Sequence, residues 1–432
     1  PQASRSVTLS RSNSAQSSGQ SSSQSSGDSP AHSPAANHEY TDSDTRWWSP
    51  GSDRVFPTVS DYTNDNGASR VVLDGKPVDT KNHPFFALQS PNGRACVTCH
   101  QPSDGMSLSV ATIRNRWQES NGTDPLFAAY DGSNCPVLPQ TLSTSHSLLL
   151  DHGLFRIELP WPPKPRDGKN VVTDFSIAVM RDPWGCNTSP EFGIDGKNQS
   201  ISVYRRPRPV ANLKYLTAVG FAYDPKQGMP LPLDAVTGKP LSGNIMADNR
   251  ATTLQAQMQD ASATHLELME ELSAKQIAEI EGFILRLYAA QARSDNGGDL
   301  ADGAHGGPEL LRDSEPGQLG SIGRAVWSEF EPWGNMDKAT KAGLTAEQIA
   351  YRESVARGAR LFREKMFLIS DSAGINSPVG FGNPVLNSCV FCHNMSQMGN
   401  DVAPGQPVFS CIGVRVYRIS RLLLYCSNGL ER

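Results

Sequence analysis

One short pattern, Cys-x-x-Cys-His, occurs twice in this chain and constrains it more than any other feature. Residues 96–100 read CVTCH and residues 389–393 read CVFCH. Two copies of so specific a pattern argue against chance. The spacing places two thiols where they can form thioethers with the two vinyl groups of one haem, and the adjacent histidine then faces the iron as its axial ligand. The fold is therefore expected to enclose two large, flat, apolar cofactors.

Two other chemistries also use paired cysteines. A tetrahedral zinc site needs four ligands, which the two motifs supply only jointly, although Cys96 and Cys389 are 293 positions apart. A thioredoxin-like dithiol needs one Cys-x-x-Cys at a strand-to-helix turn, whereas the preceding residues, QSPNGRA, have the composition of a loop. The favoured interpretation is two covalently bound haem c groups, with zinc and a redox dithiol as alternatives. The residues it assigns are Cys96, Cys99, Cys389 and Cys392 for attachment, with His100 and His393 as proximal iron ligands.

Composition limits where such a protein works. The net charge is −5 and no basic cluster precedes the last 20 residues, so nothing supports nucleic-acid binding. No apolar run approaches 18 residues, so we expect no transmembrane segment. Because bacteria attach haem c outside the cytoplasm, we expect a periplasmic or other extracytoplasmic location, with the signal sequence not present in this chain.

The cysteines outside the two motifs carry a further expectation. Cys135 and Cys186 both lie in turn-rich sequence, and an oxidising compartment favours their pairing. A disulfide between them would close a loop of about 50 residues and stabilise the fold by ~4 kcal/mol in the chain-entropy model. The alternative is two unpaired thiols.

Composition also suggests how the chain is divided. Residues 1–45 are rich in Ser, Gln and Gly and are expected to form a disordered tail. The Gly- and Asp-rich residues 293–309 separate an expected N-terminal haem domain, 46–292, from a C-terminal one, 308–432. The predicted fold class is mainly α: two cytochrome c-type haem domains with a small β element inserted at about 130–240.

Local patterns place the elements. Residues 154–160, 174–183 and 202–210 alternate like strands. Val110, Ile113 and Trp117 have helical spacing. Residues 46–90 carry turn signals and little periodicity, and no element is assigned there. Three further helices are indicated by capping boxes, at Thr252 to Gln255, Ser273 to Gln276 and Thr345 to Gln348, and the second of these carries Ile277, Ile280, Ile284 and Leu287 on one face.

The first of these three helices carries the most informative histidine. Leu254, Met258, Ala261, His265 and Leu268 recur at spacings of four and three, so His265 lies on the apolar face. It is the candidate distal residue, either as the sixth iron ligand or as an acid/base group, and the alternative is a hydrogen-bonded core histidine. Glu267 and Glu270 flank it on a face expected to be solvated. Weaker candidates near a haem are His83, His146, His152 and the thioether of Met106.

These residues resemble one known family, the bacterial di-haem cytochrome c peroxidases and their MauG-like relatives. The resemblance rests on the two Cys-x-x-Cys-His motifs, on HPFF…NGRACVTCHQP at 83–102, and on NIMADNRATTLQAQMQDA at 244–261. With ARGARLF before the second motif, it spans about residues 80–400. It implies reduction of hydrogen peroxide, or electron transfer, with one haem open to substrate and one that relays electrons.

The sequence departs from the family pattern in three places. The two motifs are further apart than is usual, which implies an insertion, and the central run has Ala247 and Asn249 where Trp and Gly are expected. Only 39 residues follow His393, and the last 25 turn basic and apolar. We therefore expect an altered or truncated C-terminus and an incomplete second haem domain.

Three functions are consistent with these features. The first is a peroxidase-like oxidoreductase in periplasmic electron transfer, with a small redox protein or quinol-linked donor and hydrogen peroxide as partners. The second is a non-enzymatic electron-carrier cytochrome c, which the altered central run and the lack of an assignable catalytic acid favour. The third is a haem-bearing binding or sensing module.

Overall fold

The structure, a computed structural model, describes residues 46–87, 90–162, 176–217, 245–246, 251, 253–304, 306–313, 329–371, 376 and 382–389. Over these residues the chain is 36% helix and 18% strand, with the strands in four small sheets. The expectation of a mainly α fold is therefore wrong, and the described chain is mixed α/β. The predicted tail, residues 1–45, lies outside the described residues.

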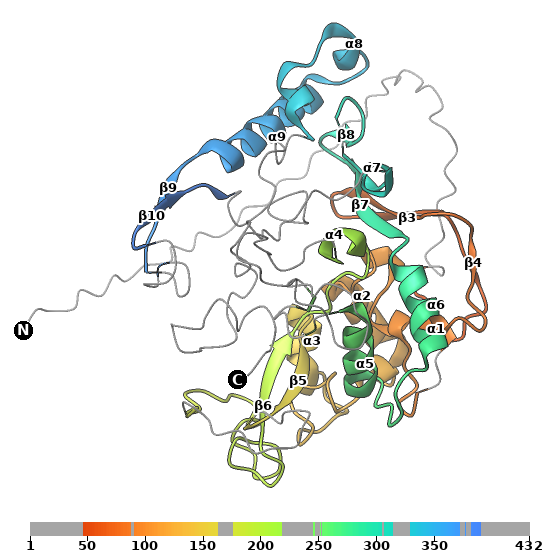
Figure 1. Ribbon diagram of the computed structural model, residues 1–432, viewed down its shortest axis with the longest axis vertical. Helices are drawn as coiled ribbons and strands as arrows, with labels where there is room; N and C mark the ends of the chain where they lie inside the picture. The colour runs from red at the N-terminus through yellow and green to blue at the C-terminus, as the bar shows by residue number, and fades with distance from the viewer. Residues whose placement is uncertain are drawn as a thin grey trace, which may run out of the picture. The chain divides into compact units, whose positions relative to one another are not determined.

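The largest sheet joins distant parts of the sequence (Figure 1). Its order is β2-β3-β7-β8, and every neighbouring pair is antiparallel. The strands are β2 (Val59–Asn64), β3 (Gly67–Leu73), β7 (Leu287–Ser294) and β8 (Gly298–Asp299). Gly67 permits the close approach of β7, because a Cβ at this position would lie 2.2 Å from the carbonyl oxygen of Arg293. Strands β2 and β3 lie in residues 46–90, where no element was assigned.

The other three sheets are antiparallel pairs: β1 (Val55–Phe56) with β4 (Val78–Asp79), β5 (Phe155–Pro160) with β6 (Ser200–Arg205), and β9 (Phe367–Ile369) with β10 (Val385–Asn387). The β5–β6 pair confirms two of the three strands predicted within residues 130–240. Of the third, 174–183, the described residues 176–183 contain no strand.

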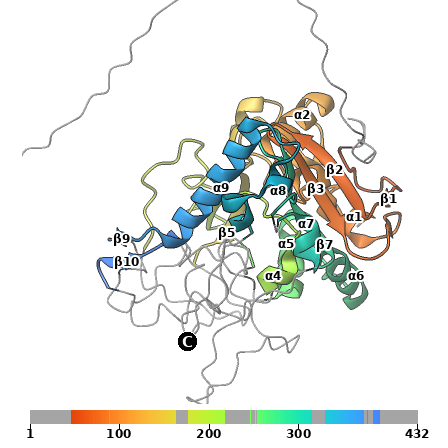
Figure 2. The same ribbon diagram turned by 90° about the horizontal axis from the view of Figure 1, so that it is seen from above.

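The helices are α1 (Pro84–Ala87), α2 (Val110–Ser120), α3 (Ser147–His152), α4 (Leu213–Thr217), α5 (Leu254–His265), α6 (Ala274–Ile284), α7 (Pro308–Asp313), α8 (Lys338–Lys341) and α9 (Ala346–Glu364). Figure 2 shows most of them from above. The capping boxes of α6, at Ser273, and of α9, at Thr345, are confirmed. Helix α5 is capped by Thr253, one residue later than predicted. Leu287 was expected on the α6 face, but the helix ends at Ile284 and Leu287 begins β7.

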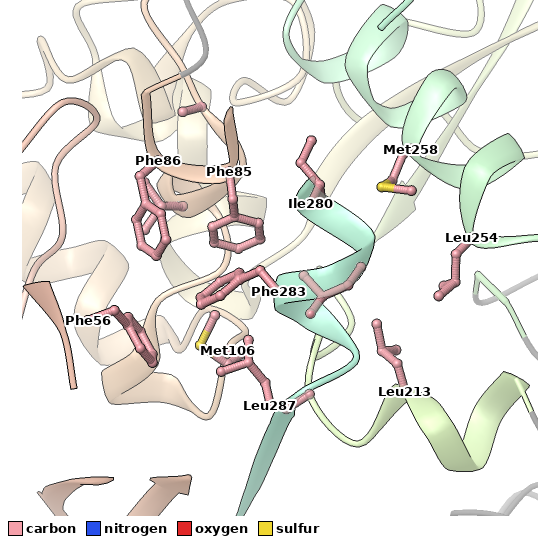
Figure 3. Close-up of a cluster of buried hydrophobic side chains, with 14 of the residues drawn as sticks. Phe56, Phe85, Phe86, Met106, Leu213, Leu254, Met258, Ile280, Phe283 and Leu287 are labelled. Carbon is pink, nitrogen blue, oxygen red and sulfur yellow. The ribbon is translucent and has the colours of Figure 1, made fainter. Parts of the chain in front are cut away.

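The main hydrophobic core is built around α6. Its Phe283 ring lies 5.0 Å from Phe85 and 5.1 Å from Phe86, both of α1, and 5.2 Å from Phe56 of β1. Figure 3 shows these phenylalanines on one side of α6, with Leu213 of α4 and Leu254 and Met258 of α5 on the other. Because α1 lies a few residues before the first Cys-x-x-Cys-His motif, this core fixes α5 relative to that motif.

Two further features stabilise the chain. Cys135 and Cys186 form the predicted disulfide, with their Cα atoms 5.5 Å apart, and both residues are buried. Arg352 of α9 is buried and donates hydrogen bonds to the carbonyl oxygens of Gly297, Asp299 and Asp302. These oxygens lie in residues 293–309, which contain β8 and the start of α7. The division into two haem domains at this segment stays a prediction.

Within the described residues, no helix combines the length and the apolar character that crossing a membrane requires.

Candidate haem cavity

The first Cys-x-x-Cys-His motif folds into a tight turn. Cys96–Thr98 form a single 3₁₀ turn, and the Thr98 hydroxyl accepts a hydrogen bond from the Ala95 N–H at 3.0 Å. The next residue after the motif, Gln101, is fully buried, and its side-chain amide donates to the carbonyl oxygens of Val97 and Trp48. These hydrogen bonds hold the backbone of the motif in place. Cys96 and Cys99 line the same cavity.

His100 is held in the state that a metal ligand requires. Its Nδ1 lies 3.1 Å from the carbonyl oxygen of Met106, which can only accept, so Nδ1 carries the proton and Nε2 keeps its lone pair. Burial lowers the pKa of His100 to about 4, so the imidazole is neutral at pH 7. A histidine that ligates a metal commonly donates its other N–H to a backbone carbonyl in this way, which fixes the ring orientation.

The cavity in front of the motif has a volume of about 190 Å³ and is mostly apolar. Among the described residues that line it, none is an aspartate or a glutamate, whereas four are arginines: Arg94, Arg205, Arg206 and Arg208. Such a lining, apolar with only positive charges, suits a ligand that is apolar over most of its surface and carries negative groups. A haem, with its flat ring and two propionates, has that character.

One face of α5 forms a wall of this cavity. Leu254, Gln257, Met258, Ala261 and His265 line it, at the spacings of three and four that put residues on one side of a helix. The prediction that His265 lies on the apolar face of this helix is confirmed. Leu268 was expected to continue the face, but α5 ends at His265, so Leu268, Glu267 and Glu270 lie beyond the helix. Glu270 is exposed and Glu267 is half-buried.

A buried charged network holds His265 in place. Asp131 accepts a hydrogen bond from Nδ1 of His265 at 2.8 Å through Oδ2, and one from Nη1 of Arg94 at 2.6 Å through Oδ1. The side chains of Arg94 and Asp131 are each 1% exposed, whereas that of His265 is 27% exposed. Burial alone would raise the pKa of Asp131, but the charge of Arg94 and the hydrogen bond from His265 lower it below its usual range. Because Nδ1 of His265 is hydrogen-bonded to the Asp131 carboxylate, Nε2 is the ring nitrogen that can interact with a ligand in the cavity.

Arg94 also forms hydrogen bonds with backbone carbonyls of two other segments. It donates to the carbonyl oxygens of Pro125 and Leu126, and Nη1 lies 3.2 Å from the carbonyl oxygen of His265. Since Arg94 lies two residues before Cys96, it connects the first Cys-x-x-Cys-His motif to the loop containing Asp131 and to the end of α5. The charge of Arg94 is balanced by Asp131 and its donors are occupied by backbone carbonyls.

The three weaker candidate histidines lie away from the cavity. His146 is buried with Nδ1 2.7 Å from the Gly132 carbonyl oxygen and Nε2 2.9 Å from that of Gln140, so both ring nitrogens are engaged. His152 ends α3 and is exposed. His83 packs against Phe283 at 5.2 Å, and burial lowers its pKa. These three lie outside the cavity wall.

The sequence made the thioether of Met106 a candidate iron ligand, but Met106 does not line the cavity. It lies on the His100 side, is fully buried in the main core, and contributes its carbonyl oxygen. A thioether does line the cavity on α5, that of Met258.

The two thiols of the motif are free and half-buried. Neither Cys96 nor Cys99 is in a disulfide. Burial raises the pKa of each to about 12, so both are protonated at neutral pH. Among the described residues, no group of three or more His, Cys, Asp and Glu side chains is placed to hold a metal ion.

The second motif is described only at its start. Cys389 lies two residues after the end of β10 and is half-buried, whereas Cys392 and His393 lie outside the described residues. Their assignment to a second haem stays a prediction.

The sequence did not single out several residues in or beside the cavity. Asp131 precedes His265 by 134 positions, and nothing local marks it as a partner. The expectation that no basic cluster precedes the last 20 residues missed the arginines at 205, 206 and 208, although the run RRPRP at 205–209 is visible in the sequence.

Comparison with protein-family models, with curated proteins and with solved structures found no match to this chain.

Proposed function

We propose that this protein is a c-type cytochrome of the peroxidase-like kind, with haem attached at Cys96 and Cys99 and His100 as its axial ligand. A second haem is proposed at Cys389, Cys392 and His393. The observation that carries the proposal is one apolar, positively charged cavity that contains both motif cysteines, a neutral histidine with its Nε2 free, and a second histidine fixed by a carboxylate.

The haem, when bound, supplies a redox-active iron for the two-electron reduction of hydrogen peroxide, in which H₂O₂, two electrons and two protons give two waters. The electrons come from a donor, proposed to be a small redox protein or a quinol-linked carrier. The protein itself supplies proton transfer. His265 has Nδ1 bound to Asp131, so a neutral His265 has Nε2 available to accept a proton from a hydroperoxide and return it to the departing oxygen.

Asp131 acts in this proposal as the positioning residue for His265. Its carboxylate fixes the tautomer and orients the ring, and Arg94 in turn fixes the carboxylate. Gln257 lines the same cavity from α5 and adds a neutral hydrogen-bonding group. With His265 and Ser262, helix α5 thus presents three polar residues on an otherwise apolar wall, which is the pattern expected of a binding site that orients a small polar molecule.

The second candidate function is electron transfer without catalysis. The observation that favours it is the thioether of Met258 in the cavity wall on α5. A His/Met-ligated iron is six-coordinate and typical of electron-carrier cytochromes c. The two functions therefore differ in which residue of α5 acts at the iron.

We also propose a periplasmic or other extracytoplasmic location. Covalent haem attachment supports it, and so does the disulfide between Cys135 and Cys186, because such bonds persist in oxidising compartments.

The test uses the full chain produced in bacteria that mature haem c. Covalent haem is measured by its absorption after acid–acetone extraction, and peroxidase turnover with a reduced dye as donor. His265→Ala is expected to keep covalent haem and lose about 10²- to 10⁴-fold in turnover. The matched control is His152→Ala, an exposed histidine outside the cavity, which is expected to leave turnover unchanged.

Met258→Ala separates the two functions. If the protein is an electron carrier, this variant loses its six-coordinate low-spin absorption spectrum while the wild type has no peroxidase turnover. If it is a peroxidase, the spectrum of this variant stays as in the wild type. Wild-type protein without covalent haem would contradict both functions.

A further inference from the structure

A short basic segment crosses one side of the cavity. Residues 205–210, Arg-Arg-Pro-Arg-Pro-Val, begin at the last residue of β6, and all six line the cavity. We call them the arginine strap. Its start is fixed by the β5–β6 register, which pairs Arg205 with Phe155, another lining residue. Two prolines restrict the backbone of the rest, so the strap is a pre-shaped segment.

Hydrogen bonds join the strap to the loop that holds His100. The N–H of Val210 donates to the Met106 carbonyl oxygen at 3.0 Å, and this same oxygen accepts from Nδ1 of His100. The Ser107 hydroxyl donates to the Pro207 carbonyl oxygen at 2.8 Å. On the other side, Nη1 of Arg208 donates to the Met246 carbonyl oxygen. The strap therefore has a fixed place relative to the proximal histidine.

The charge of the cavity is concentrated on this strap. Three of the four lining arginines belong to it, and the fourth, Arg94, is buried and balanced by Asp131. No described residue in the lining is acidic. The strap arginines are only partly buried, with Arg206 and Arg208 exposed at the rim, while the floor is formed by apolar side chains such as Ile280 and Ile284.

Guanidinium groups at the edge of an apolar cavity select a particular ligand shape. Arginine binds carboxylates through two parallel hydrogen bonds, and it does so more strongly where water is partly excluded. The matching ligand is flat and apolar on the side that enters and carries carboxylates on the side that stays at the rim.

We propose that Arg205, Arg206 and Arg208 bind the two propionate groups of the haem attached at Cys96 and Cys99. This inference rests on the proposed function, because it needs a haem in the cavity. It adds the orientation of that haem, with the propionates toward the strap. It also makes the strap a determinant of the reduction potential, because positive charge near the iron disfavours its ferric state.

The test compares full-length wild type with Arg205→Gln, Arg206→Gln, Arg208→Gln and the triple variant. Arg293→Gln is the matched control, because Arg293 is a largely exposed arginine on β7, outside the cavity lining. Three quantities are measured: covalent haem content, the resonance Raman bending band of the propionates, and the midpoint potential of each haem.

We expect the triple variant to keep its thioether-linked haem, to shift the propionate band, and to lower the midpoint potential of one haem while the other is unchanged. The control is expected to match wild type in all three. Arg208→Lys keeps the positive charge but cannot form the paired hydrogen bonds. It is therefore expected to shift the propionate band as Arg208→Gln does, while its midpoint potential stays at the wild-type value.

Several results would overturn the inference. If the triple variant carries haem and its propionate band and potentials equal those of wild type, the strap does not bind propionates, whereas the proposed function stands. If added succinate, a free dicarboxylate, perturbs the wild-type haem spectrum but not that of the triple variant, and the propionate band is the same in both, the strap binds a separate carboxylate. Wild type without covalent haem removes the proposed function and the inference together.

Discussion

Replacing Asp131 by asparagine tests the buried network beside the cavity. The substitution keeps the shape of the side chain and removes its charge, which leaves the guanidinium of Arg94 buried without a counterion. The two side chains are each 1% exposed, and Nη1 and Oδ1 are 2.6 Å apart. With charge centres roughly 4 Å apart and an effective dielectric constant of about 20, their attraction is ~4 kcal/mol. Removing one partner of a buried pair costs about 3–5 kcal/mol, in the same range.

We therefore expect Asp131→Asn to lower the free energy of unfolding by about 3–5 kcal/mol at pH 7, measured by urea denaturation followed by tryptophan fluorescence. The chain offers a matched control in the Arg114–Asp151 pair, whose side chains are 53% and 54% exposed. Asp151→Asn is expected to change the free energy by less than ~1 kcal/mol.

The pH dependence gives the same prediction a second test. The folded protein holds the pKa of Asp131 below its usual range, so its contribution to stability is present above the unfolded pKa of about 3.9 and is lost as the pH falls toward the folded pKa. The difference in unfolding free energy between wild type and Asp131→Asn should stay constant from pH 7 to about pH 5 and shrink as the pH is lowered below about 4. A cost below ~1 kcal/mol at pH 7, or a difference that grows in acid, would refute this account of the network.

Three further predictions concern the core, the disulfide and the thiols. Phe283→Ala removes the ring that packs on α1 and should cost about 3–5 kcal/mol in urea denaturation; an unchanged midpoint would contradict the packing. Replacing Cys135 and Cys186 by serine should cost ~4 kcal/mol, and dithiothreitol should then no longer shift the midpoint. Because burial raises the pKa of Cys96 and Cys99 to about 12, haem-free folded protein should react slowly with iodoacetamide at pH 8 and much faster in urea; equal rates in both conditions would place these thiols outside the core.

The sequence predicted local features of this fold well. The helix starts at Ser273 and Thr345 depend on a side chain three residues away, so they can be read from a short window. The apolar placement of His265 follows from helical periodicity alone. The disulfide followed from turn composition and the expected compartment, and it joins residues 51 positions apart.

The long-range pairing of strands could not be predicted from the sequence. Strand β3 pairs with β7 from Leu73↔Leu287 to Gly67↔Ser294, and no local pattern marks either strand as the partner of the other. The predicted helical position of Leu287 failed for the same reason, because sheet hydrogen bonds ended the helical periodicity at Ile284. In the cavity, the residues that hold His265 come from the loop containing Asp131 and from Arg94, so the network is a product of tertiary structure.

The distant origin of the cavity walls means that the cavity exists only in the folded chain. His265, at the end of α5, lies 166 positions after Cys99, and Arg205 lies 106 positions after it. In an unfolded chain, the thiols of the first motif therefore have neither the α5 wall nor these arginines beside them. The proposed attachment of haem at Cys96 and Cys99 is then a reaction of the exported, unfolded chain, and the walls of the cavity assemble around the attached group when the chain folds.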